Sequence, residues 1–155
     1  MHPDLEKIDS ALNSAGKDQM LAWRFGLACV EEVADNLESD EVIAVLERFR
    51  LCVANNAADS QPELQELSSL MAKLSASHPG SKSLDGTRHA AVSATYALAK
   101  AVNGRAVEAA AYAAYSQIYA YGGYAVTDPE CFSQVHRIQL KILLALIKPT
   151  LSTST

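Results

Sequence analysis

The sequence lacks the alternation of apolar and polar residues, with a period of two, that marks half-buried β-strands. It has five prolines, and each lies where a periodic apolar segment begins or ends. Asn103-Gly104 and Asp85-Gly86 border alanine-rich segments, so they predict helix ends and not hairpin turns. These absences exclude a β-sheet and predict an all-α fold.

The chain also lacks an excess of basic residues. Its net charge is −5 and its isoelectric point is about 5.3, which excludes the basic footprint of a nucleic-acid-binding protein. Residues 109–127 carry no charge, but they are mainly alanine, tyrosine and glycine, which are too weakly apolar for a membrane span. A hydrophobic content of 49% is typical of a globular protein. The acidic charge and the weakly apolar segment 109–127 together predict that the partners are neither nucleic acid nor membrane.

Motifs that carry catalysis or bind metals are missing as well. The chain contains no Glu-x-x-His or His-Glu-x-x-His, and its four histidines lie in four separate segments. It contains neither Gly-x-Ser-x-Gly nor a phosphate-binding Gly-x-x-x-x-Gly-Lys. The sequence therefore predicts no catalytic residue, no metal and no cofactor. An enzyme with an unrecognised site remains an open alternative.

Cysteine is scarce, and its pattern does not favour disulfides. Cys29, Cys52 and Cys131 are widely spaced and odd in number, and no Cys-x-x-Cys occurs. This spacing is typical of reduced cysteines in the core of a cytoplasmic protein. The N-terminal residues are acidic and amphipathic, without the apolar core of a signal peptide, which also favours a cytoplasmic protein.

Apolar residues recur at helical spacing throughout the chain, and turn or capping residues separate the segments. They predict one domain, residues 1–155, of about seven helices. The expected helices span residues 3–14, 18–37, 40–55, 60–76, 86–102, 104–121 and 129–148. Short connections favour antiparallel helical hairpins, arranged as a bundle or a stack. We expect a loop at 77–84 between an acidic half and an Ala/Tyr-rich half, and a frayed tail at 150–155.

Charge is distributed unevenly along the chain. Residues 1–80 hold 6 Lys and Arg against 14 Asp and Glu, whereas residues 81–155 hold 7 against 4. Glu31, Asp35 and Glu38 are expected to share one helix face, which Asp40 and Glu41 continue across the turn. The cluster has two interpretations: a solvated face, or a surface that attracts a basic protein partner.

The segment 90–125 contains 14 alanines, and all six tyrosines lie between residues 96 and 124. Tyr112, Tyr115 and Tyr119 follow the spacing i, i+3 and i+7, so they form one stripe. We expect these rings to be mostly buried against alanine faces of the preceding helix and against the last helix. The alternative is a cleft for a small or lipophilic ligand.

Two segments carry a resemblance to a known family. Residues 21–33, LAWRFGLACVEEV, place Ala-Cys before an acidic turn and a valine, and residues 109–121 form an alanine-dense run. Together they resemble small all-helical bacterial immunity proteins. The resemblance implies a cytoplasmic module that binds and neutralises a cognate toxin, and it brings no catalytic residues.

The last predicted helix is largely apolar. The residues concerned are Val135, Ile138, Ile142, Leu143 and Leu146. Such a face can serve a core or a symmetric homodimer, and we expect a homodimer. The leading hypothesis from the sequence is a non-enzymatic, all-α protein-binding module, and the runner-up is a ligand binder that uses the tyrosine stripe.

Overall fold

The computed structural model describes residues 2–16, 18–55, 60–76, 89–121 and 128–152. Within these ranges the chain is helical and has no strand, so the predicted all-α fold is confirmed. The elements are α1 (Pro3–Ser14), α2 (Gln19–Glu31), the short 3-10 helix η1 (Ala34–Asn36), α3 (Asp40–Ala54), α4 (Gln61–Ala76), α5 (His89–Val102), α6 (Ala106–Tyr121) and α7 (Pro129–Ser152).

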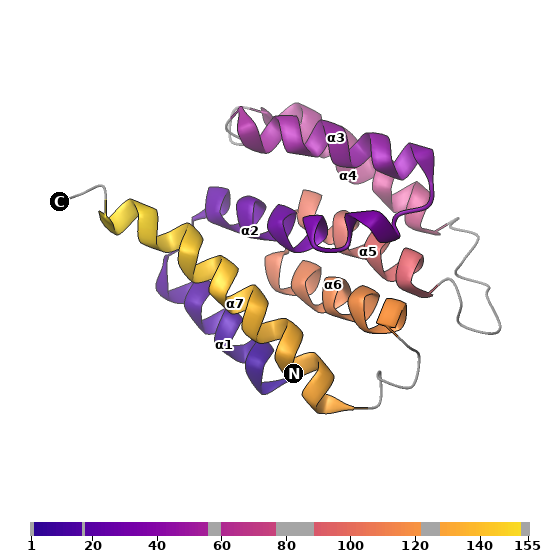
Figure 1. Ribbon diagram of the computed structural model, residues 1–155. Helices are drawn as coiled ribbons and strands as arrows, with labels where there is room; N and C mark the ends of the chain where they lie inside the picture. Colours follow the sequence, from indigo (N-terminus) through magenta and orange to yellow (C-terminus); the bar gives the residue numbers. More distant parts are fainter. Residues whose placement is uncertain (1, 17, 56–59, 77–88, 122–127, 153–155) are drawn as a thin grey trace.

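The helices form three layers (Figure 1). α2, α5 and α6 make the central layer, α3 and α4 cover one side of it, and α1 and α7 cover the other. α3 packs on α4 and α5 packs on α6, as short connections predict. The main partner of α1 is α7, from the other end of the chain, which the expectation of sequential hairpins did not include.

Side-chain caps begin the helices where the sequence predicted them. Asp18 Oδ1 accepts a hydrogen bond from the backbone N–H of Leu21 at 3.1 Å, at the start of α2. Ser39 Oγ accepts one from the backbone N–H of Val42 at 3.4 Å, at the start of α3. Asp128 Oδ1 accepts from the backbone N–H of Glu130 at 3.0 Å, directly before α7. The expected loop at 77–84 and the expected helix end at Asp85-Gly86 lie outside the described residues.

The second predicted helix, 18–37, is interrupted in the structure. α2 ends at Glu31, and η1 follows after a short turn. Glu31 and Glu32 lie where negative charge opposes the helix macrodipole, and α2 has no basic residue in its last turn. Val33 and Leu37 remain buried through the turn, so the apolar pattern continues although the helix does not.

The last predicted helix continues farther than expected. α7 passes through Pro149 and ends at Ser152, so the predicted end at Lys148 is wrong. Proline has a helical φ of its own, so the backbone can continue as a helix, although Pro149 lacks the N–H that would bond to the carbonyl oxygen of Ala145. Residues 150–152 of the expected frayed tail are therefore helical, and residues 153–155 lie outside the described part of the chain.

Alanine forms the contact between the central helices. The fully buried alanines of α5 and α6 are Ala94, Ala97, Ala101, Ala109, Ala110, Ala113 and Ala114. α2 approaches just as closely, because a Cβ added to Gly26 would lie 3.2 Å from Ala101 Cβ. Small side chains allow these helix backbones to approach each other at the centre of the core.

The close contact between Gly26 of α2 and Ala101 of α5 predicts that Gly26→Val destabilises the protein by about 1–3 kcal/mol, because the added methyl groups would separate the two helices. Ala44→Val, on the exposed side of α3, is the matched control and has only a small helix-propensity cost. Thermal unfolding followed by circular dichroism measures both. Equal midpoints of thermal unfolding for the two variants would contradict the close contact between α2 and α5.

A buried polar chain joins α7 to the centre of the molecule. His136 is 2% exposed, and its Nδ1–H donates to Gln139 Oε1 at 2.7 Å. Gln139 Nε2 in turn donates to the carbonyl oxygen of Ala110 at 2.9 Å. The His2 ring at the start of α1 lies 5.3 Å from the His136 ring. Burial lowers the pKa of His136, so the folded protein holds this imidazole neutral.

This lowered pKa predicts a loss of stability in mild acid. Below the ordinary histidine pKa of about 6.5 the unfolded chain binds a proton that folded His136 resists, so falling pH favours unfolding. The loss grows until the pH reaches the lowered pKa of the folded protein. Denaturant titrations between pH 7 and pH 5 should therefore show a shallower pH dependence for His136→Gln than for the wild type. A wild-type slope in His136→Gln would show that the buried imidazole is not the source of the acid sensitivity.

Candidate partner-binding surface

Four of the predicted acidic residues lie together on the surface. Asp35, Glu38, Asp40 and Glu41 are all exposed, and they occupy η1, the turn after it and the first residues of α3. We call residues 35–41 the acidic segment. Asp40 and Glu41 stand in the first turn of α3, where the helix dipole favours negative charge.

Buried neighbours hold the acidic segment in place. Leu37, inside the segment, is 7% exposed, and Val33 and Val42 on either side of it are each 1% exposed. Asn36 Nδ2 donates to Ser116 Oγ at 3.0 Å, and Ser116 Oγ donates to the carbonyl oxygen of Ala90 on α5 at 2.7 Å. The carboxylates therefore project from a backbone that is fixed to the central helices.

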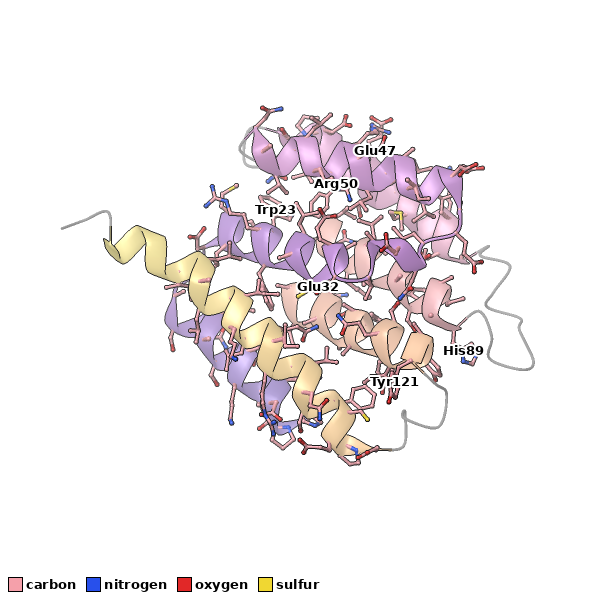
Figure 2. All side chains as sticks on the ribbon, in the orientation of Figure 1. Trp23, Glu32, Glu47, Arg50, His89 and Tyr121 are labelled. Carbon is pink, nitrogen blue, oxygen red and sulfur yellow. The ribbon has the colours of Figure 1, made fainter. Side chains whose placement is uncertain are left out.

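Glu31 is paired within the protein, unlike the four residues of the acidic segment. Because α2 ends at Glu31, the expected shared helix face with Asp35 and Glu38 does not form. Instead, Arg50 Nε and Nη2 donate to Glu31 Oε1 at 3.0 and 2.7 Å, and these bonds raise the pKa of Arg50. Figure 2 shows Arg50 on α3, next to Glu47. The charge of Glu31 is thus offset within the protein.

The charge of the acidic segment is not offset in this way. The salt bridges within the described part of the chain involve none of Asp35, Glu38, Asp40 and Glu41. Other acidic side chains do find partners, for example Glu63 with Arg48 at 2.7 Å and Glu108 with Lys100 at 3.2 Å. The segment is therefore a compact patch of uncompensated negative charge.

The expected burial of the tyrosine stripe is realised only in part: it is wrong for Tyr115, whereas Tyr112 packs against the core. Tyr115 is 41% exposed, and Tyr112 and Tyr119 are only half-buried. Alanines fill the centre of the α5–α6 contact, so the rings lie beside it: Tyr112 packs against the core and lies 5.5 Å from Tyr96 of α5, measured between ring centroids.

The rings instead form a surface row with aromatic neighbours. Tyr115 lies 6.3 Å from Tyr119 and 5.0 Å from Phe132 of α7, measured between ring centroids. Tyr119 lies 4.9 Å from His89, and Figure 2 shows His89 at the same end of the α5–α6 pair as Tyr121. The three pockets described for the structure, of about 440, 350 and 220 Å³, have no tyrosine in their lining. None of these three pockets therefore corresponds to the predicted tyrosine-lined cleft.

Groups with catalytic potential are few in the described structure. The three cysteines are free thiols, and burial raises the pKa of Cys29, Cys52 and Cys131, which disfavours the reactive thiolate. Within the described ranges, no group of three or more His, Cys, Asp or Glu side chains could hold a metal ion. No helix in those ranges combines the length and apolarity that a bilayer span requires.

Comparison of the chain with protein-family models, curated proteins and solved structures gives no significant match. The candidate site is therefore described by the geometry of the acidic segment alone. Two of its determinants, Asn36 and Arg50, were missed from the sequence. Each bonds to a residue on another helix, and a local sequence pattern carries no signal for such a contact.

The outward position of the tyrosines predicts that Tyr115→Ala costs about 1 kcal/mol of stability, the size of an exposed aromatic pair contact. Phe49→Ala, which truncates an aromatic ring that is 0% exposed, should cost about 3–5 kcal/mol. Chemical denaturation of both variants measures the difference. If Tyr115→Ala were as destabilising as Phe49→Ala, the ring would be part of the core after all.

Proposed function

We propose that this protein is a non-enzymatic protein-binding module whose acidic segment engages a cationic protein partner. The observation that carries the proposal is the display of Asp35, Glu38, Asp40 and Glu41, four exposed carboxylates without salt-bridge partners in the described structure, on a backbone held by buried anchors. A fixed charged surface loses little conformational entropy when a partner binds, which favours affinity.

The expected contribution of this surface is mainly kinetic. A concentrated negative potential steers a positively charged partner toward the site and raises the association rate above that of neutral proteins. The attraction extends over about 8 Å at physiological ionic strength, so salt weakens it. A partner of this kind has Lys and Arg side chains that complement the four carboxylates.

An inhibitor of the immunity type fits these properties. A nuclease toxin has a basic surface that binds nucleic acid, and an acidic protein can cover that surface. The resemblance of residues 21–33 and 109–121 to small bacterial immunity proteins agrees with this class. We therefore propose a cytoplasmic bacterial protein that neutralises a cognate basic toxin.

The test combines partner capture with charge reversal. Proteins captured from a lysate of the native host are identified, and association with the captured partner is measured by surface plasmon resonance at low and high salt. Changing Asp35, Glu38 and Glu41 together to Lys should lower the association rate at low salt by about tenfold or more and flatten its salt dependence. The three positions are exposed, so folding should be preserved.

A control variant carries the same change in net charge elsewhere. Glu6, Glu66 and Glu130 are exposed residues of α1, α4 and α7, and their joint change to Lys should leave the association rate at low salt within about twofold of the wild type. If the association rate falls equally in the control and in the acidic-segment variant, only the net charge of the protein matters. If the association rate falls in neither variant, the acidic segment only makes the protein soluble.

We further propose that α7 provides the contact of a symmetric homodimer. Ile138 is 51% exposed and Leu144 is 41% exposed, whereas Leu143 between them along the chain is fully buried in the core. α7 thus carries apolar side chains on its outer side in addition to those that pack on the core. Burial of these side chains against a second copy would remove them from water.

Light scattering at several protein concentrations tests the homodimer. The wild type should show a dimer mass at high concentration, and the double variant Ile138→Lys/Leu144→Lys should show a monomer mass. Leu51→Lys, at the 63% exposed Leu51 of α3, should leave the dimer intact. A monomer mass for the wild type throughout would contradict the homodimer.

A further inference from the structure

A pocket of about 440 Å³ opens between α2, α4 and α5, away from the acidic segment. Two aliphatic side chains and six residues with hydrogen-bonding groups line it; the six are Trp23, Gln61, Gln65, Ser68, Ser69 and Asn103. The lining contains no ionisable side chain. Its volume lies within the range of small-molecule sites, and its groups are amides, hydroxyls and an indole.

The indole of Trp23 lacks a hydrogen-bond partner. Trp23 is 5% exposed, and its Nε1–H has no acceptor among the described residues. An indole N–H only donates, and a buried donor without an acceptor is unfavourable. Figure 2 shows Trp23 between α2 and the layer formed by α3 and α4. Trp23 lines the pocket, and its buried N–H would gain a hydrogen bond from an acceptor placed beside it.

The space beside this donor is occupied by a movable group. Gly104 has a φ of +74°, and a Cβ at this position would lie 3.4 Å from Trp23 Nε1. The end of the Gln19 side chain fills the space that the missing Cβ leaves, and Gln19 and Gly104 line the neighbouring pocket of about 350 Å³, so this group separates the indole N–H from that side. Rotation of this flexible side chain would free the space for a ligand oxygen.

One wall of the pocket is already positioned. Asn103 Nδ2 donates to the carbonyl oxygen of Ala99 at 2.9 Å, and Asn103 Oδ1 accepts from Ser68 Oγ at 2.5 Å. These bonds fix the Asn103 amide between α5 and α4. Gln61, Gln65 and Ser69 are exposed and can adjust to a ligand at the entrance.

We propose that this pocket binds a small, uncharged, hydroxyl-rich molecule of about monosaccharide size, with one ligand oxygen accepting from Trp23 Nε1–H. The absence of charge in the lining favours a neutral ligand, because an ion would lose its hydration without gaining a counter-charge. Amides and hydroxyls both donate and accept, and the hydroxyl groups of a sugar or polyol match them. The proposal is independent of the acidic segment.

Trp23 is the only tryptophan, so its indole N–H gives a single reporter signal in a proton–nitrogen correlation spectrum. The full chain is titrated with neutral monosaccharides and linear polyols, and with the corresponding sugar phosphates and uronic acids. At least one neutral compound should shift the indole signal saturably. Its charged counterpart should bind about tenfold more weakly or worse. Absence of a saturable shift across the panel would overturn the proposal, as would equal binding of charged and neutral members.

Variants locate the binding. Gln65→Leu should weaken binding by about tenfold without lowering the thermal midpoint, because Gln65 is an exposed lining residue. Gln134→Leu, an equivalent change on the exposed side of α7, should bind as the wild type does. Gln19→Ala should bind equally well or more tightly, since it frees the space beside the indole. Loss of binding in Gln19→Ala, or equal binding in Gln65→Leu and Gln134→Leu, would overturn the assignment.

Discussion

The close approach of α2, α5 and α6 is the constraint on which the rest of this structure depends. Alanine contacts between α5 and α6, together with the contact of Gly26 with Ala101, bring three helix backbones together at the centre. A central layer this thin leaves its outer faces to be covered by the pairs α3–α4 and α1–α7. Small side chains fill the centre of this contact, so the larger tyrosine rings of α6 lie beside it, from Tyr112 against the core to the exposed Tyr115.

The central layer also positions the acidic segment. Ser116 of α6 and the Ala90 carbonyl of α5 hold Asn36 through consecutive hydrogen bonds, and buried apolar residues fix the chain on both sides. A loop attached only at its ends would distribute its carboxylates over many conformations. Here the core restricts them to one surface, and the proposed function uses this restricted cluster as its recognition surface.

The two proposed sites use different chemistry and different elements. The acidic segment concentrates charge on exposed side chains. The lining of the pocket has no charged side chain, and it includes Trp23, whose buried N–H lacks an acceptor among the described residues. Charge is suited to attracting a macromolecule over a distance, and buried neutral donors are suited to discriminating a small ligand at contact. Either proposal can fail without affecting the other.

The sequence by itself determined most helix starts, because a period of 3.6 residues and capping residues such as Asp18, Ser39 and Asp128 are local signals. It did not determine the end of α2 at Glu31 or the continuation of α7 through Pro149. It also identified Asp35, Glu38, Asp40 and Glu41 as a cluster, since they are close along the chain. Tertiary structure alone decided the rest. The pairing of Glu31 with Arg50, the outward position of Tyr115 and the unpaired Trp23 indole depend on contacts between helices, and neither the spacing nor the type of a residue specifies which neighbours the fold places beside it.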